Sequence, residues 1–204
     1  MRPIFITGID TGIGKTIVSA ILTESLEADY WKPVQSGDLE YTDTDKVKEL
    51  VSNTKTRFYP EAYRLTQPFS PHKSADLDGI QINLGNIAIP PTDNQLIIEG
   101  AGGLMVPLNN TELMLDLIKK LDAEVVLVSR NYLGSINHTL LSIEVLKRNN
   151  IPIKALLFNG NTDTYSESFI INYSPVKSVI HIPEIDIFNK ETIKKLASEI
   201  KLNA

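Results

Sequence analysis

The chain has 204 residues, 42% of them hydrophobic, and carries 20 Lys and Arg against 25 Asp and Glu for a formal net charge of −5. This length and hydrophobic content fit one domain with a sizeable core. The acidic balance, without a concentrated run of positive charge, disfavours a nucleic-acid partner. Cysteine is absent, which excludes disulfides, thiolate nucleophiles, iron–sulfur clusters and cysteine-ligated zinc.

The apolar runs of the chain are short. None reaches the roughly 18 consecutive apolar residues that indicate a membrane-spanning helix. The first three residues lead directly into a strand-like run, not into the long apolar stretch of a signal peptide. We therefore expect no membrane partner and a cytoplasmic location.

Short runs rich in β-branched residues alternate with longer segments in which apolar residues recur three and four positions apart. Several runs are continuously apolar, as in strands of a parallel sheet that helices cover on both faces. The pattern predicts an α/β fold with a doubly wound, mainly parallel sheet, forming a single domain over residues 1–204. The strands are expected at 3–7, 30–34, 95–99, 124–129, 153–159 and 178–182, and the helices at 15–28, 43–53, 111–121, 135–149 and 190–202.

Residues 53–93 show little periodicity, and we expect irregular structure there with one short helix. Within that part of the chain and just beyond it, residues 84–95 form a short, proline-interrupted stretch. We expect this stretch to affect the periphery of the molecule and not its chemistry.

The most informative segment is residues 4–16, with the sequence IFITGIDTGIGKT, followed by a helical pattern. A strand, a glycine-rich turn and a helix start in this order are typical of a loop that binds nucleotide phosphates. Lys15 would reach the β and γ oxygens, and Thr16 would offer a hydroxyl to Mg²⁺. Five residues, not the usual four, separate Gly8 from the Gly-Lys-Thr triplet. The segment predicts binding of ATP or GTP; a strand-to-helix turn with chance glycines is the weaker interpretation.

An acidic residue that could complete a Mg²⁺ site follows the apolar run at 96–98. Glu99 comes directly after this run and before Gly-Ala-Gly-Gly, which places it at the carboxyl edge of the sheet beside the phosphate loop. A hard cation prefers such oxygen ligands. An acid there can also cap a helix or face solvent, but the glycines indicate a close approach of the backbone to a ligand. The acidic residues at 38–49 are mostly a solvated surface, although one of them could be a metal ligand.

Further motifs follow the phosphate loop in a defined order. They are Trp-Lys-Pro-Val-Gln-Ser-Gly at 31–37, Thr-Asp at 44–45, Ser-Pro-His at 70–72, Glu-Gly-Ala-Gly-Gly at 99–103 and Leu-Gly-Ser-Ile-Asn-His at 133–138. In order and spacing, residues 1–185 resemble the dethiobiotin synthetase family, whose phosphate loop has the same five-residue gap. Several separate motifs in order are more specific than any one of them.

The resemblance implies an ATP- and Mg²⁺-dependent ring closure in which 7,8-diaminopelargonate and CO₂, or bicarbonate as its source, give dethiobiotin, ADP and phosphate during biotin synthesis. One amine captures CO₂ as a carbamate, the γ-phosphoryl group activates it as a mixed anhydride, and the second amine closes the ring. The protein would supply positioning and charge stabilisation. A site with two lysines and no cysteine suits that chemistry.

The resemblance also implies which residues form the site. Lys15 would act on the transferring phosphoryl group and Lys32 on the carbamate, with a solvated surface lysine as the alternative for Lys32. The residues implied in ATP binding are Gly12, Ile13, Gly14, Lys15, Thr16, Ile17, Asp45, Glu99, Gly100, Ala101, Gly102, Asn159, Gly160, Pro183 and Glu184.

The metal and the base each have implied partners. Mg²⁺ would be held by Thr16, Asp45 and Glu99, although Asp43 lies two residues from Asp45 and either could face the ion. Asn159 would read adenine, because an amide can pair with N7 and the 6-amino group whereas guanine presents a carbonyl. We therefore expect ATP to be preferred over GTP.

The implied substrate contacts lie in three separate segments. The loop at 133–137 opens a helical pattern, so its N–H groups could hold the substrate carboxylate. In the family this loop comes from the neighbouring subunit, which predicts a homodimer; Ser135 as a plain helix N-cap is the alternative. His138 and His181 are expected to be structural. The resemblance implies that residues 70–72 shape the substrate cleft, whereas His72 by itself would be a loop histidine without a task. The implied contacts are Thr11, Ser36, Ser70, Pro71, Leu133, Gly134, Ser135 and Asn137.

A partition-type regulatory ATPase is the main alternative, because it shares this fold and loop. Those proteins carry a second lysine five residues before the loop lysine, where this chain has Asp10. An amphipathic membrane-targeting helix is also not evident near residue 204. Cobyrinate amidating synthetases need a glutaminase domain with a nucleophilic cysteine, which this chain lacks. A nucleotide-binding scaffold without catalysis would leave Lys32, Ser36 and Glu99 unexplained.

Overall fold

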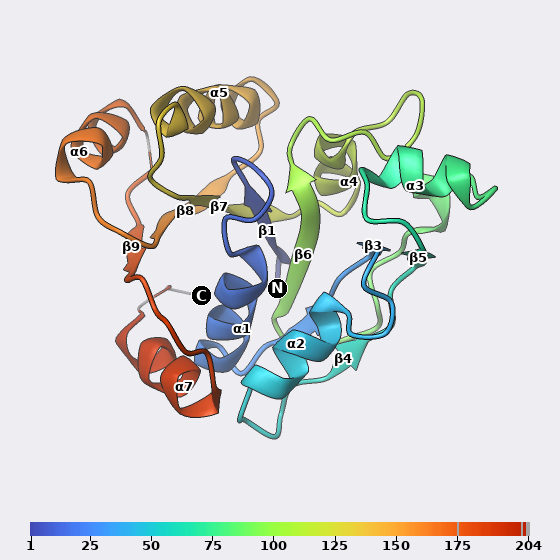
Figure 1. Cartoon of the computed structure of the whole chain (residues 1–204), viewed down its shortest axis with the longest axis horizontal. Helices are drawn as coiled ribbons and strands as arrows, with labels where there is room; N and C mark the ends of the chain where they lie inside the picture. The colour runs from blue at the N-terminus through green and yellow to red at the C-terminus, as the bar shows by residue number, and fades with distance from the viewer. Residues whose placement is uncertain (175, 201, 203–204) are drawn as a thin grey trace.

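The computed structural model describes residues 1–174, 176–200 and 202. Its main sheet has seven strands in the order β4-β2-β6-β1-β7-β8-β9, and all of their pairings are parallel (Figure 1). The predicted α/β fold with a parallel sheet is confirmed. The strands are β1 (Ile4–Gly8), β2 (Asp29–Trp31), β4 (Phe58–Tyr59), β6 (Leu96–Gly103), β7 (Glu124–Ser129), β8 (Ile153–Asn159) and β9 (Val179–Ile182).

Helices cover both faces of this sheet (Figure 1). One layer holds α1 (Lys15–Ser25), α2 (Asp43–Leu50) and α7 (Lys190–Glu199). The other holds α3 (Pro71–Leu77), α4 (Met114–Lys120), α5 (Ser135–Arg148) and α6 (Thr164–Tyr173). None of these helices, in the part of the chain that the structure describes, has the length and apolar content needed to cross a bilayer.

The central strand shows how one apolar run serves two cores. Ile4 and Ile6 pack under the layer of α1, whereas Phe5 between them packs under the layer of α5, and all three are fully buried. Successive side chains of a strand point to opposite faces, so a strand inside two layers is apolar at every position. β1 and its neighbour β6 are therefore firmly held, and their carboxyl ends carry the phosphate loop and Glu99.

Two predicted strands differ from the structure by more than one residue at an end. The run at 30–34 is divided, because Pro33 has no N–H to donate to a ladder. β2 ends at Trp31, and β3 (Val34–Ser36) pairs in parallel with β5 (Tyr63–Leu65) as a separate small sheet. β6 continues beyond Glu99 to Gly103, which pairs with Gly8 of β1. The expectation that this strand ends at Glu99 is wrong.

Several predicted helices are shorter in the structure because polar side chains fix the neighbouring backbone. Asn109 Oδ1 accepts from the N–H groups of Thr111 and Glu112, so α4 begins only at Met114. The Glu24 carboxylate accepts from the N–H of Ser52, and α2 has already ended. α1 ends at Ser25 and α7 at Glu199; position 201 of the predicted last helix lies outside the described residues.

Residues 53–93 contain the one short α-helix expected there, α3, together with β4, β5 and a 3₁₀ turn at Leu84–Asn86. The short strands were not predicted. Helix α6 was also missed, because polar residues interrupt its sequence and its aromatic side chains Tyr165 and Phe169 are exposed instead of forming an apolar stripe.

Candidate active site

The phosphate loop joins β1 to α1 and depends on glycine at two positions. Gly12 and Gly14 have φ angles of 72° and 91°, in the left-handed region that other residues rarely adopt. A Cβ atom on Gly14 would also lie 2.2 Å from Asn159 Nδ2. Gly14 is the residue that precedes the first turn of α1, which begins at Lys15. The predicted strand, glycine turn and helix start are thus present.

Lys15 lies inside this loop. Its Nζ donates a hydrogen bond of 2.9 Å to the carbonyl oxygen of Asp10, and the residue is only 9% exposed. Burial lowers the pKa of its ammonium to about 8, and the nearby Glu99 carboxylate opposes that shift only in part. A cation with so little solvent around it attracts an anionic group strongly.

Glu99 is the centre of a buried polar group at the ends of the central strands. Its Oε1 accepts hydrogen bonds from Thr16 Oγ1 at 2.9 Å and from Lys32 Nζ at 3.0 Å. Its Oε2 accepts from the Tyr30 hydroxyl at 2.9 Å. Glu99 and Lys32 are 1% and 4% exposed, so the alternative of a solvated surface lysine is wrong.

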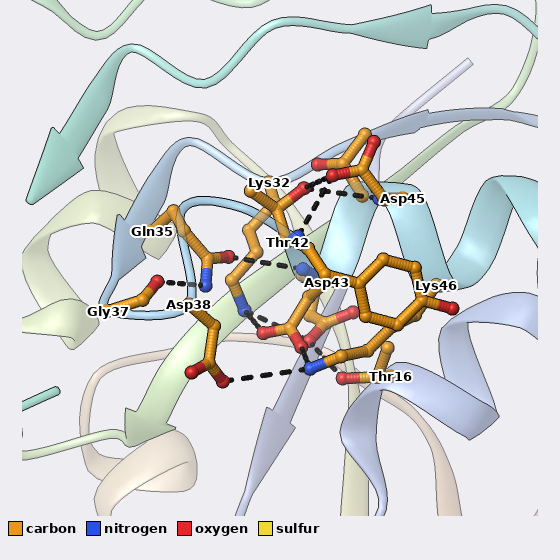
Figure 2. A network of polar contacts seen from close by, with 12 residues as sticks. Thr16, Lys32, Gln35, Gly37, Asp38, Thr42, Asp43, Asp45 and Lys46 are labelled. Atoms are coloured by element: carbon orange, nitrogen blue, oxygen red, sulfur yellow. Dashed lines mark hydrogen bonds and ion pairs between the residues drawn. The ribbon is translucent and has the colours of Figure 1, made fainter. Parts of the chain in front are cut away.

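A second carboxylate completes the surroundings of Lys32. Asp43 Oδ2 lies 2.9 Å from Lys32 Nζ, and Asp43 Oδ1 lies 3.1 Å from Lys46 Nζ (Figure 2). Burial would lower the pKa of Lys32, but Glu99 and Asp43 outweigh it and the pKa is raised. Burial would likewise raise the pKa of Asp43, but Lys32 outweighs it and the pKa is lowered. We call the following residues the Glu99 cluster: Thr16, Tyr30, Lys32, Asp43 and Glu99.

Asp45 does not belong to this cluster. Its Oδ2 accepts from Thr42 N at 2.9 Å and from Thr42 Oγ1 at 2.8 Å, and its own N–H donates to that hydroxyl (Figure 2). The Thr42 hydroxyl lowers the pKa of Asp45. The two residues form the capping box of α2. Asp43, the first residue of α2, points into the site, and two positions along a helix turn the side chain by about 200°. Of the two aspartates that the sequence left open, Asp43 and not Asp45 lies beside Lys32 and Glu99, where it could meet a metal ion.

The oxygen atoms of the cluster fit Mg²⁺. Within the described residues no group of three or more His, Asp or Glu side chains could enclose a metal ion. Mg²⁺ in nucleotide sites commonly takes only one or two carboxylates, with substrate phosphates and water as its other ligands. Thr16, Asp43 and Glu99 offer a hydroxyl and two carboxylates around Lys32, beside the phosphate loop.

The residues expected to hold the base lie on the other side of the phosphate loop. Asn159 Nδ2 donates 2.8 Å to the carbonyl oxygen of Ile13, and Gly160 N donates 2.8 Å to Ile182 at the end of β9. Glu184 follows β9 and accepts two hydrogen bonds from one Arg130 nitrogen, at 2.9 and 3.0 Å. The structure thus gathers the predicted residues Asn159, Gly160, Pro183 and Glu184 at one edge of the loop.

A cavity of about 350 Å³ opens between the phosphate loop, the end of β6 and α5. Of the predicted substrate contacts, Thr11 lines it. His138, expected to be structural, also lines it, and its Nδ1 lies 2.7 Å from the Tyr132 hydroxyl. The lining residues that sequence reasoning did not assign to the site include Asp10, Met105, Val106, Leu141 and Val145.

The predicted contacts at 36 and 70–71 belong to β3 and to the start of α3. Ser36 ends β3, and its buried hydroxyl has no hydrogen-bond partner among the described residues. Ser70 is the N-cap of α3 and the buried Pro71 is its first residue, so His72 lies in the first turn of this helix and not in a loop. Neither segment lines the cavity of Thr11. A buried hydroxyl without a partner at the end of a strand is a group that a ligand could satisfy.

The loop at 133–137 lies on the outside of the molecule. Leu133 is fully exposed, and Asn137 is exposed on the first turn of α5. Gly134, with a φ of 104°, is the N-cap of α5, whereas Ser135 is buried as the first helical residue. The alternative of Ser135 as a plain N-cap is therefore wrong. Among the described residues, no hydrogen bond joins this loop to the Glu99 cluster.

The structure also places His181 and Tyr30. His181 pairs with Glu167 at 3.3 Å and stacks on the Phe158 ring, which agrees with its expected structural role. Tyr30 was missed as a site residue. It lies two positions before Lys32, so the alternation of a strand places both side chains on the same face, a signal that the sequence contains.

Comparison with known proteins gives a consistent answer. A family model described as an AAA domain matches residues 2–192. The ATP-dependent dethiobiotin synthetase BioD of Christiangramia forsetii is 51% identical over 197 residues, which cover 97% of this chain and 95% of that protein. The enzyme of the same name from Cytophaga hutchinsonii is 48% identical, with coverages of 98% and 97%.

Solved structures with the same fold are more distant in sequence. The cell division ATPase MinD of Pyrococcus furiosus superposes with a TM-score of 0.61 at 15% identity, over 98% of each chain. A ParA family ATPase from Chlorobium tepidum gives a TM-score of 0.52 at 13% identity, over 97% of this chain and 98% of that one. Likeness at this level of identity shows a shared fold and nothing about shared activity.

Proposed function

The chain belongs to the dethiobiotin synthetase family, and we propose that the Glu99 cluster and the phosphate loop together carry out the family's ring closure. The protein is an ATP-dependent ligase of biotin biosynthesis. The observation that carries the assignment of the site is Lys32, a lysine only 4% exposed that lies between two carboxylates next to the phosphate loop. The alternative of a partition-type ATPase is not favoured, because Asp10 occupies the position of that class's second lysine.

The proposed reaction has three bond-forming steps. One amine of 7,8-diaminopelargonate adds to the carbon of CO₂ and loses a proton, which gives a carbamate. A carbamate oxygen then attacks the γ-phosphorus of ATP, and the bond to ADP breaks. The second amine attacks the carbamate carbon, phosphate leaves with the former carbamate oxygen, and the amine loses its proton as the ring closes. No group of the protein is covalently modified in these steps.

Each lysine has a distinct task in this proposal. The Lys15 ammonium, inside the phosphate loop, stabilises the charge on the transferring phosphoryl oxygens. The Lys32 ammonium lies outside the loop but on the same edge of the sheet, next to Glu99. Lys32 is therefore the lysine that stabilises the carbamate oxygens. The raised pKa of Lys32 keeps it charged, so it acts as a fixed cation and not as a base.

Thr16, Asp43 and Glu99 are the residues that would hold Mg²⁺. The ion, when bound with ATP, neutralises charge on the phosphate oxygens. The protein's own contribution is the placement of these three oxygen donors, which comes from the first turn of α1, the first turn of α2 and the middle of β6. Lys32 Nζ lies within 3.0 Å of both carboxylates and offsets their charge.

The remaining assignments concern the ends of the two substrates. Asn159, together with Gly160, Pro183 and Glu184, would contact adenine and favour ATP over GTP. The apolar lining of the Thr11 cavity suits the carbon chain of 7,8-diaminopelargonate, and the Ser36 hydroxyl suits its amine or carbamate. We further propose a homodimer in which the loop at 133–137 of the second copy holds the substrate carboxylate; the full exposure of Leu133 supports a partner there.

We also propose that residues 1–204 act as a single synthetase domain and that the enzyme works in the cytoplasm, where ATP and bicarbonate are both available. The support for one domain is that the main parallel sheet carries the phosphate loop after β1, Glu99 within β6 and Asn159 at the carboxyl end of β8.

The function is tested by phosphate release from ATP and Mg²⁺, with and without 7,8-diaminopelargonate and bicarbonate, coupled to mass detection of the product. Release that requires both additions, with a product of the mass of dethiobiotin, is the expected result. ATP hydrolysis that is indifferent to the diamine would contradict the proposal and would favour a regulatory ATPase.

A further inference from the structure

Tyr30 is a buried residue of the Glu99 cluster that the proposed reaction does not use. It belongs to β2, which pairs with β6 in a register that places Tyr30 opposite Ile97. The side chain is fully buried and packs under the layer of α1 and α2, with its ring 6.0 Å from that of Phe58. Its hydroxyl donates to Glu99 Oε2 at 2.9 Å.

The chemistry of this position calls for an explanation. A phenylalanine would fill the same space in the core, whereas a buried hydroxyl costs free energy unless it has a partner. The Tyr30 hydroxyl has one such partner among the described residues, the Glu99 carboxylate. Glu99 is itself almost completely buried, so its orientation depends on the groups that donate to it.

The donors to Glu99 differ in what happens to them when the substrates bind. Thr16 Oγ1 and Lys32 Nζ both donate to Oε1, and both belong to the groups proposed to meet Mg²⁺ and the carbamate. Tyr30 donates to the other oxygen from a ring that is packed into the core. Its hydrogen bond is therefore the one that stays in place when Thr16 and Lys32 change partners.

We propose that Tyr30 is a positioning residue for the reaction: its hydroxyl holds Glu99 Oε2 so that Oε1 stays directed toward Thr16 and the proposed metal site. This inference rests on the role given to Glu99 in the proposed function. In this role the Tyr30 hydroxyl orients Glu99 in the way that a hydrogen-bond donor outside the metal's own ligands orients a metal-binding carboxylate.

The test compares Tyr30→Phe with the wild-type enzyme by calorimetric titration with ATP, once with Mg²⁺ and once with a chelator. We expect the Mg²⁺ concentration at half-saturation to rise about 10-fold. The affinity for ATP without metal should stay unchanged, because Tyr30 does not touch the phosphate loop. The matched control is Tyr59→Phe, which removes a hydroxyl that donates to Asp29 and Pro91 at 3.1 Å. This control should leave the Mg²⁺ dependence at the wild-type value.

A double-mutant cycle separates positioning from packing. In the Glu99→Gln background, Tyr30→Phe should have no further effect on Mg²⁺ dependence, because both changes act on one contact. A wild-type Mg²⁺ dependence in Tyr30→Phe would overturn the inference. Additive effects in the cycle, or an equal loss of ATP affinity without metal, would also overturn it by showing a general packing defect.

The failure of this inference can be distinguished from the failure of the proposed function. The titration uses only ATP and Mg²⁺, so it does not depend on turnover of the diamine. If the wild-type enzyme forms no dethiobiotin, the proposed function fails whatever Tyr30 does. If it forms dethiobiotin and Tyr30→Phe behaves as the wild type in both titrations, the inference alone fails.

Discussion

The two ends of the proposed active site are the Glu99 cluster with the phosphate loop and, at the other end, the Thr11 cavity. They differ in how many of their side chains have an interaction partner within the chain. In the Glu99 cluster, Lys32 Nζ lies within 3.0 Å of a carboxylate oxygen of Asp43 and of Glu99, and all three residues come from one chain. At the Thr11 cavity, by contrast, Met105 and Leu141 are 59% and 57% exposed. The difference teaches that ion pairs within the chain organise the phosphate end, whereas large apolar side chains at the diamine end stay exposed, as the proposed homodimer would require.

The largest effect is expected from Lys15→Ala, which tests the organised end. Removal of the loop ammonium should weaken ATP binding and lower turnover together, with kcat/KM for ATP reduced about 1,000-fold. Steady-state kinetics with ATP as the varied substrate measure this change. Lys48→Ala, an exposed lysine on α2, serves as the control and should behave as the wild type. Near-wild-type activity in Lys15→Ala would show that the phosphates bind elsewhere.

The next prediction compares two aspartates of one helix. Asp43→Asn should raise the Mg²⁺ requirement by at least about 10-fold, because Asp43 lies in the cluster. Asp45→Asn should leave the Mg²⁺ requirement unchanged and lower the free energy of unfolding by at most about 1 kcal/mol, because it weakens a helix cap. Mg²⁺ titrations of turnover and urea unfolding measure the two effects. The reverse order of the two variants would restore Asp45 as the metal ligand.

The pair Asp43 and Asp45 also shows what sequence reasoning could not decide. Both are acids in one polar run, and the choice between them depends on the residue at which α2 begins. That start is fixed by the Thr42 cap, whose hydrogen bonds to Asp45 are visible only in three dimensions. The phosphate loop was predictable because its glycines, lysine and threonine are consecutive, and the local chain determines their geometry.

A similar contrast holds for the fold. Continuously apolar runs predicted the central strands, since burial on both faces leaves a direct trace in the sequence. The small sheet of β3 and β5 was not predictable, because it depends on a pairing between segments almost thirty residues apart and on the break at Pro33. The Thr11 cavity is likewise made by three distant segments, and lining residues outside the motifs, such as Met105 and Leu141, carry no pattern that would reveal it.

The pH dependence of ATP use would sharpen the account of the organised end. Burial lowers the pKa of Lys15 to about 8. The side chain therefore carries its positive charge below that pH and loses the charge as the pH rises above it. We expect kcat/KM for ATP, which reports the free enzyme, to be level below pH 8 and to fall about 10-fold per pH unit above it. The residual kcat/KM for ATP of Lys15→Ala should not fall with pH in this way. A level profile through pH 10 in the wild type would contradict the assignment.

The smallest effect is expected at the proposed dimer contact of the diamine end. Leu133→Asp places a charge on a fully exposed leucine of the loop at 133–137. If a second copy covers this residue, the change should shift the chain toward a monomer in sedimentation and raise KM for 7,8-diaminopelargonate several-fold, with KM for ATP unchanged. Ile187→Asp, on another exposed apolar residue, is the control. A wild-type oligomeric state and KM in Leu133→Asp would show that the diamine end is complete in one chain.

The central claim is that the two lysines divide the work, with Lys15 on the phosphates and Lys32 on the carbamate. The most direct measurement is a single turnover of Lys32→Ala with bound ATP, in which ATP affinity and dethiobiotin formation are followed in the same sample. We predict ATP affinity near that of the wild type and a rate of product formation about 100-fold lower. Equal losses of affinity and rate, as expected for Lys15→Ala, would contradict the division. So would an unchanged rate.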